Sequence, residues 1–204
     1  MEVLPMQGKG FVTRMMVGLA LLTAASSVFA AMSIPYGWYL EGNAGSTNLT
    51  KKSYPGSAST SGLGGNMNVG YKFIPYFATE VGYSIYATTS INAPGGTQAG
   101  QDKHYSYDIA ARGILPVCKT GLEFFAKLGI SHLTSTVTIK NNTAAALIGL
   151  TSSNNNDVNA YTGLGAQYFF IPEIAAVVQW QRAFGSDSTG NLDLYSGGLT
   201  LLVD

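Results

Sequence analysis

Three residues of one segment carry the side-chain types of nucleophilic catalysis. His104, Ser106 and Asp108 are two positions apart, so on a β-strand they would share one face. A serine nucleophile needs a base within about 3 Å and an acid to orient that base. Positions i and i+2 of a strand are about 6.5 to 7 Å apart, so these side chains would have to lean together. Hydrolysis is one hypothesis, and an ordinary row of polar side chains is the favoured one.

The second histidine gives no better catalytic candidate. Strand alternation predicts that Ser131 points inward and His132 outward, so the two side chains cannot cooperate. With two histidines and one cysteine in the chain, we expect neither a metal site nor a cofactor. Cys118 has no partner for an internal disulfide and is predicted to be a free thiol at a turn.

Charged residues are predicted to gather on the same inward face as the row at His104. This set has three acids and three bases: Glu41, Lys72, Glu80, Arg112, Glu123 and Lys127. A balanced set of buried charges favours an ionic layer, whereas a selective channel favours one sign of charge. We therefore predict a structural plug across an interior.

The elements that must position these residues are alternating segments separated by proline. The clearest is the hairpin from Val158 to Arg182, which turns at Pro172. Because proline cannot donate to a sheet, it marks strand ends. The pattern predicts eight strands, at residues 36–46, 64–74, 76–88, 103–115, 120–139, 157–170, 173–184 and 191–203.

The connections between these strands alternate in length. Long links rich in Gly, Ser, Thr and Asn are predicted at residues 47–63, 89–102, 140–156 and 185–190, and the other links are tight turns. Long loops outside and short turns inside are typical of outer-membrane barrels. The predicted fold is therefore all-β, an eight-stranded antiparallel up-and-down transmembrane β-barrel with two aromatic belts. Outward positions are predicted for Trp38, Leu40, Met67, Val69, Tyr71, Val81, Tyr83, Ile85, Tyr107, Ile109, Leu122, Phe124, Leu128, Ile130, Val178, Trp180, Leu199 and Leu201.

The N-terminal segment is predicted to be a targeting signal. Lys9 and Arg14 precede an apolar run at residues 15–25, and small residues end it before a cut after Ala30. We therefore expect a signal peptide at 1–30 and one barrel domain at 31–204. The near-neutral chain implies no nucleic-acid partner.

Four segments resemble a known family. Residues 70–76 (Gly-Tyr-Lys-Phe-Ile-Pro-Tyr), 80–83, 126–129 and 167–175 are similar to the OmpA-type small outer-membrane β-barrels. The resemblance implies a salt-bridge network in the lumen, and Glu80, Arg112 and Lys127 occupy matching positions. Gln167 and Val177 stand where the family carries charge, which counts against a gate-like charge switch. We expect no C-terminal peptidoglycan-binding domain after the eighth strand.

The external loops hold the remaining candidates for contact. Lys51 and Lys52 lie in the first loop, and Leu147 and Ile148 lie in an apolar run at residues 144–150 of the third. That run is either a contact site or a segment folded back over the barrel mouth, which we favour.

The resulting functional hypothesis is a non-enzymatic protein of a Gram-negative outer membrane. Its role would be structural or one of surface contact, of the adhesion or host-interaction type, through four external loops. Expected partners are outer-membrane lipid, lipopolysaccharide, the barrel-assembly machinery and an external surface partner. The alternatives are a deacylase-like enzyme that modifies lipid A and a narrow pore.

Overall fold

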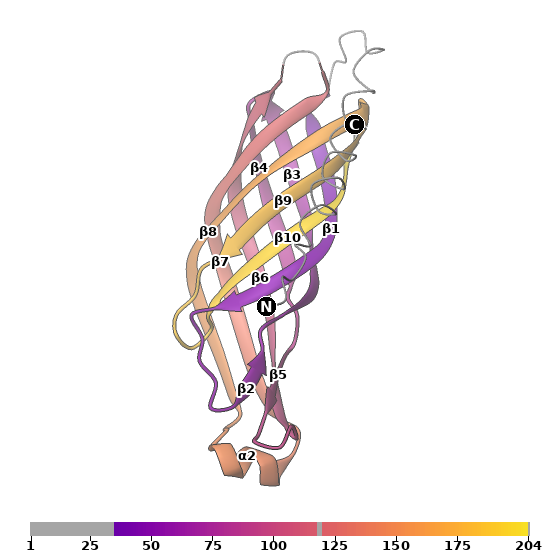
Figure 1. Cartoon of the computed structure of the whole chain (residues 1–204). Coiled ribbons are helices and arrows are strands. Elements are labelled where there is room, and N and C mark those ends of the chain that lie inside the picture. The colour runs from indigo at the N-terminus through magenta and orange to yellow at the C-terminus, as the bar shows by residue number, and fades with distance from the viewer. Residues whose placement is uncertain (1–34, 118–119, 204) are drawn as a thin grey trace, which may run out of the picture.

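The computed structural model describes residues 35–117 and 120–203 (Figure 1). The predicted signal peptide and Cys118 lie outside the described residues. Eight strands form the barrel wall: β1 (Gly37–Thr50), β3 (Ser61–Ile74), β4 (Phe77–Ile85), β6 (Gln98–Pro116), β7 (Leu122–Ile139), β8 (Ser153–Ile171), β9 (Ile174–Ala183) and β10 (Asn191–Val203). Successive strands pair antiparallel, and β10 pairs with β1, which closes the wall. The predicted eight-stranded barrel is confirmed.

The end with the long links has more regular structure than the sequence predicts. β2 (Ser57–Ser59) pairs with β5 (Thr89–Asn92), β5 pairs with β6, and β7 continues against β8 as far as Val137 and Ser153. Much of the predicted loop sequence at 47–63 and 89–102 is therefore strand, and the range 140–156 holds a short helix and the first residues of β8. The alternation that marks a strand is weak in these segments because several of their buried positions are polar, such as Thr89 and Asp102. Only the last link, between Ala183 and Asn191, has the predicted length.

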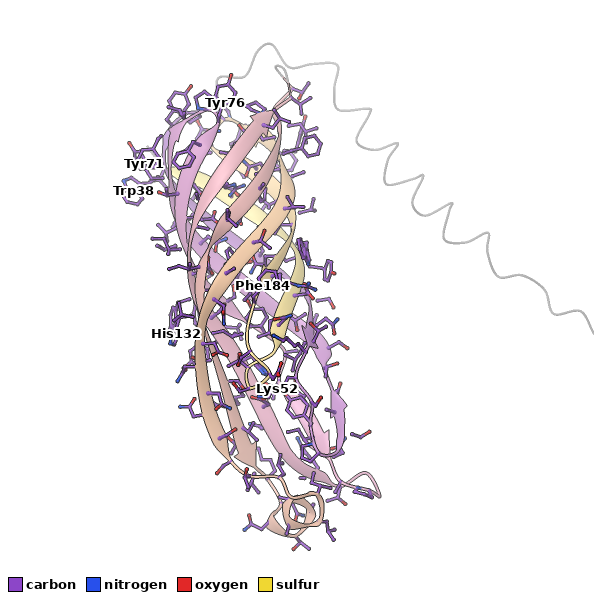
Figure 2. All side chains as sticks on the ribbon, turned by 90° about the vertical axis from the view of Figure 1, so that its left-hand side faces the viewer. Trp38, Lys52, Tyr71, Tyr76, His132 and Phe184 are labelled. Atoms are coloured by element: carbon purple, nitrogen blue, oxygen red, sulfur yellow. The ribbon has the colours of Figure 1, made fainter. Side chains whose placement is uncertain are left out.

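The outer wall carries the apolar side chains that alternation predicts. Every residue of the outward set is exposed or half-buried. Trp38 and Tyr71 pack edge to face with ring centroids 5.3 Å apart, and the rings of Tyr83 and Tyr107 lie 4.9 Å apart nearer the other end. Figure 2 shows Trp38 and Tyr71 at one end of the barrel and His132 about midway along it. Exposed apolar side chains thus form a band that ends near His132.

Beyond that band, the outward positions become polar. Lys103, Thr136, Asn154 and Asn156 are exposed or half-buried, and none of them is apolar. We call this part, made of β2, β5, α2 (Asn142–Ile148) and the adjoining ends of β6, β7 and β8, the extension. Figure 1 shows α2 at its tip. Within the described residues, no helix is long and apolar enough to cross a membrane.

The apolar run at 144–150 forms most of α2. The Asn141 side chain accepts a hydrogen bond from the Ala144 backbone N–H, and Gly149 ends the helix with a φ of 67°. Ala144, Ala145 and Leu150 are buried with Ile91 and Val137 of the extension. The prediction that this run folds back over the barrel mouth is therefore wrong. The run packs at the tip of the extension, because the apolar residues Ile91 of β5 and Val137 of β7 are there to be covered.

A glycine at the closing seam supplies a test of the fold. Gly198 of β10 faces Asn43 of β1, and a Cβ on Gly198 would overlap the backbone oxygen of Gly42. We expect Gly198→Ala to lower the free energy of unfolding by about 1–3 kcal/mol. Urea titration followed by the compact band on unheated gels would measure this. Gly197→Ala is the matched control, because a Cβ there would be 3.5 Å from the nearest atom; equal effects would contradict the seam geometry.

Candidate functional site

The charged residues of the lumen meet around Glu41. Arg112 Nη1 lies 2.8 Å from Glu41 Oε2, and Lys127 Nζ lies 3.4 Å from Glu41 Oε1. Lys127 also pairs with Glu80 at 2.7 Å. All four residues are buried to the same degree, at 1 or 2% exposure. Alternation turns each of them inward, and the closure of the wall brings them into contact.

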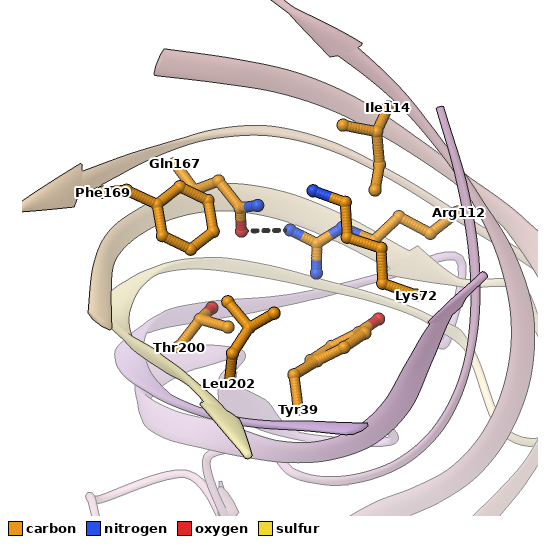
Figure 3. Close-up of a pocket in the computed structure, with 8 residues that line it drawn as sticks. All are labelled: Tyr39, Lys72, Arg112, Ile114, Gln167, Phe169, Thr200 and Leu202. Atoms are coloured by element: carbon orange, nitrogen blue, oxygen red, sulfur yellow. Dashed lines mark hydrogen bonds between the residues drawn. The ribbon is translucent and has the colours of Figure 1, made fainter. Parts of the chain in front are cut away.

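A second ion pair joins this group through an amide. Lys72 Nζ lies 2.8 Å from Glu123 Oε1. Gln167 donates to Glu123 at 2.6 Å and accepts from Arg112 Nη2 at 2.7 Å, and Figure 3 shows it beside the Arg112 guanidinium. The neutral Gln167 side chain thus links two ionic groups. The structure brings all six charged residues of the sequence prediction into one network.

Several neutral members of the network were not singled out from the sequence. The Tyr39 hydroxyl donates to Glu80 at 2.8 Å, and the Gln179 amide donates to Glu41 at 3.1 Å. Alternation would have placed them inward, but a local pattern does not tell which inward side chains touch. With them, every strand of the wall contributes to the network: Glu41, Lys72, Glu80, Arg112, Lys127, Gln167, Gln179 and Thr200.

Apolar layers close the lumen on both sides of this network. Toward the short turns lie Tyr39, Ala78, Ile114, Phe125, Phe169, Ala175, Val177 and Leu202. Toward the extension lie Leu49, Tyr86, Ala110, Leu133, Tyr161, Ala183, Leu192 and Leu194. The cavity beside Lys72 and Arg112, drawn in Figure 3, measures about 10 Å³, which is space for about one water molecule. The described lumen is therefore plugged.

The row at His104 does not assemble a catalytic relay. The Ser106 hydroxyl lies 3.1 Å from the Tyr86 hydroxyl, and His104 Nε2 lies 3.3 Å from Asp102 Oδ2. The row is buried in the interior and faces away from the outer wall. Ser131 is buried and His132 is exposed, so these two side chains do point to opposite sides of the wall.

Lys52 is buried in the extension, so its assignment as a loop contact is wrong. Its ammonium lies 2.6 Å from Asp102 Oδ2 and donates to the Ser135 hydroxyl at 2.6 Å. The Tyr54 hydroxyl donates to the same carboxylate at 2.7 Å. An unpaired buried carboxylate is costly, so Asp102 draws the lysine inward. This cluster was missed because Asp102 was placed in a loop.

The charge state of this cluster follows from its contacts. Burial alone would raise the pKa of Asp102, but His104, Lys52 and Tyr54 together hold the pKa of that carboxyl well below its usual range. Burial and the hydrogen bond to Asp102 raise the pKa of Tyr54. The Asp102 carboxylate therefore stays ionised at neutral pH, and its contacts with Lys52 anchor the first loop.

The other contact candidates stay on the surface or near it. The Lys51 side chain is 51% exposed and lies 3.8 Å from Asp187. Leu147 is 75% exposed, whereas Ile148 is half-buried against the tip of the extension. In each pair of chain neighbours, one side chain is exposed and the other packs inside. Lys51 and Leu147 face solvent, whereas Lys52 and Ile148 pack against the extension.

The ionic network predicts a large cost for removing one of its cations. Arg112→Met leaves Glu41 without its 2.8 Å partner, and we expect ~3–5 kcal/mol lower free energy of unfolding. Urea titration of the detergent-folded protein would measure it. Lys103→Met is the control, because Lys103 is an exposed cation on the outer face of β6. Similar losses for the two variants would show that the lumen network adds no special stability.

The Lys52 anchor predicts pH-dependent protection of the first loop. We expect Lys52→Met to speed hydrogen exchange at residues 51–56 by roughly tenfold, or ~1.4 kcal/mol. Because folding lowers the pKa of Asp102, the anchor is complete above about pH 4 and is lost only as the pH falls toward the lowered value. The difference between variant and wild type should therefore shrink below pH 4. Lys51→Met is the matched control, and an equal effect there would contradict burial of Lys52.

Comparisons with known proteins agree with this architecture. The family described as outer membrane protein beta-barrel domain matches residues 17–203. An uncharacterized protein of Coxiella burnetii is 25% identical in an alignment of 167 positions that covers 70% of this chain and 66% of that protein. The chain thus spans less than two thirds of that relative.

Solved structures share the fold at low identity. OprG from Pseudomonas aeruginosa has a TM-score of 0.59 at 12% identity, with 85% of this chain and 98% of that chain covered. Neisserial surface protein A has a TM-score of 0.54 at 15% identity and coverages of 81% and 96%. Ail, the attachment invasion locus protein of Yersinia pestis, has a TM-score of 0.51 at 11% identity and the same coverages. The chain belongs to the outer-membrane β-barrel family, and it is an outer-membrane protein of the small OmpA-like type.

Proposed function

We propose that this protein is a non-enzymatic surface-contact protein, which binds a partner outside the cell through the extension. One observation carries the proposal: an ordered sheet projects beyond the apolar band, while the lumen beneath it is plugged. The plug leaves no described passage for a solute, and the buried row at His104 has no nucleophile paired with a base. The surfaces that remain for function are those outside the lumen.

The extension has two sheet edges without a paired strand in the described structure. β2 pairs only with β5, and β8 pairs with β9 only from Tyr161 onward. The Ala160 oxygen accepts a bond from the Phe184 N–H on the β9 side. Because backbone groups alternate sides along a strand, those of Asn154, Asn156 and Val158 point the same way, past the end of β9.

Such an edge fits an extended peptide of a partner protein. Unpaired N–H and C=O groups template the addition of a strand, and proteins that avoid this place proline or lysine at the edge. Residues 153–158 contain neither. The Asp157 carboxylate accepts bonds from Ser186, which leaves the edge between Ser153 and Asn156 as the accessible part.

Other contacts follow from position. The outward apolar band would meet outer-membrane lipid, and Lys51 beside it would meet lipopolysaccharide phosphates. The outward alternation of Tyr195, Leu199 and Val203 on the last strand suits the barrel-assembly machinery, after signal cleavage at Ala30. The shared fold with the attachment invasion locus protein of Yersinia pestis gives a contact role a precedent.

A proline at the β8 edge tests the proposal. Asn156→Pro removes an N–H that points away from β7, so the barrel should fold, and attachment of expressing cells to host cells or matrix-coated surfaces should fall to the level of cells without the protein. Asn156→Ala is the matched control, because it removes the same side chain and keeps the N–H. We expect that variant to attach normally.

Three results would contradict the proposal. The first is equal attachment by cells with and without the wild-type protein. The second is steady conductance from the pure protein in planar bilayers, which a plugged lumen forbids. The third is loss of an acyl chain from lipid A that Ser106→Ala abolishes, since this would restore the enzymatic alternative.

A further inference from the structure

Asp108 is a buried lumen carboxylate that the ionic network leaves out. It is 6% exposed, and neither of its oxygens has a hydrogen-bond partner in the described structure. The ion pairs of the described lumen use Glu41, Glu80 and Glu123 against Lys72, Arg112 and Lys127. Because those six charges balance, an ionised Asp108 adds one uncompensated negative charge to a sealed interior. An isolated buried charge is unstable in a low dielectric, so something positive must accompany it.

Gly82 has no side chain, and this lets oxygens of the two neighbouring strands lie over it. Gly82 of β4 lies between Asn68 of β3 and Asp108 of β6 in the strand register. A Cβ built on Gly82 would lie 2.5 Å from Asn68 Oδ1 and 2.7 Å from each Asp108 carboxylate oxygen. Three oxygens from two strands therefore lie close together over this glycine, where a Cβ would collide with them.

The orientation of Asn68 makes this convergence significant. Its Nδ2 donates to Glu41 Oε1 at 3.0 Å. A carboxylate of an ion pair can only accept, so the N–H₂ group must face Glu41 and Oδ1 must face Asp108. Asn68 is 2% exposed and its Oδ1 has no partner among the described atoms. Two acceptors that face each other in a dry interior repel unless a positive species lies between them.

A fourth buried oxygen belongs to Ser131, on the other side of Asp108 from Gly82. Ser131 of β7 is the direct cross-strand neighbour of Asp108, it is 1% exposed, and its Oγ also has no partner in the described structure. Oxygen ligands without nitrogen or sulfur are those that hard cations prefer. The described residues hold no group of three or more His, Cys, Asp or Glu side chains suited to a metal ion, and one carboxylate balances a single positive charge.

We propose that Asp108, Asn68 and Ser131 form a buried binding site for one monovalent alkali cation, of the sodium type, over Gly82. The cation neutralises the extra lumen charge and joins β3, β6 and β7 above the ionic network. The cation site is separate from the extension, so a test of the site does not depend on whether the extension binds a partner. Its rival is a proton on Asp108, which would donate to Asn68 Oδ1.

Retention of radioactive sodium tests the site directly. The full chain would be folded in detergent with ²²Na⁺ and passed rapidly through gel filtration in choline chloride. We expect about one sodium ion per wild-type chain. Asp108→Asn should retain none and yet fold, because its amide N–H can donate to Asn68 Oδ1 without any cation. Gly82→Ala should also retain none, since its Cβ would push Asn68 Oδ1 and the Asp108 carboxylate apart.

Thermal stability separates the cation from the proton. In sodium chloride, the temperature at which the compact gel band is lost should exceed that in choline chloride of equal strength for wild type, and should be unchanged for Asp108→Asn. Asp187→Asn is the control, because that side chain is 90% exposed, and it should behave as wild type. The proposal is overturned if wild type retains no sodium. It is also overturned if the temperature at which the compact band is lost is the same in both salts and falls as the pH rises.

Discussion

The buried carboxylate of Glu41 is the interaction on which the rest of the structure depends. It accepts from Arg112, Lys127, Asn68, Gln179 and Thr200, which lie on five other strands. Charges at this depth are tolerable only when each is paired and its remaining hydrogen-bonding capacity is used. These contacts can form together only in one register of a closed wall, so the network favours that closure over slipped arrangements.

Filling the lumen in this way decides where function can reside. Eight strands enclose an interior just wide enough for side chains, and here apolar layers lie on both sides of the charged one. The wall outside is apolar up to the level of His132, and the extension beyond it is polar on its outward face. The surfaces that remain outside the filled lumen are the apolar outer wall and the two ends of the barrel. The extension is the larger of those ends and the one with unpaired sheet edges.

Within the extension, burial and exposure alternate between chain neighbours. Lys52 is fixed inside by Asp102 and Ser135, while Lys51 faces solvent. Ala144 and Ala145 cover the apolar tip, while Leu147 projects from α2. The extension thus has a small core of its own, and this explains why polar sequence beyond the membrane can remain ordered as a sheet. A rigid edge loses less conformational entropy on binding than a mobile loop would.

The sequence alone determined the strand number, the closed wall and the face of each lumen residue. It could do so because the two-residue period of a strand is local, and an apolar outward face makes that period visible in the part of the wall that carries the apolar band. It failed at Lys52, at β2 and at the start of β8, because polar residues stand on both faces there and remove the contrast. Only the tertiary structure decided which inward residues touch: Glu41 meets Thr200 from 159 positions away, and Asp108 meets Asn68 across Gly82. Those contacts depend on register and closure, which are properties of the whole wall and are not encoded in any single strand.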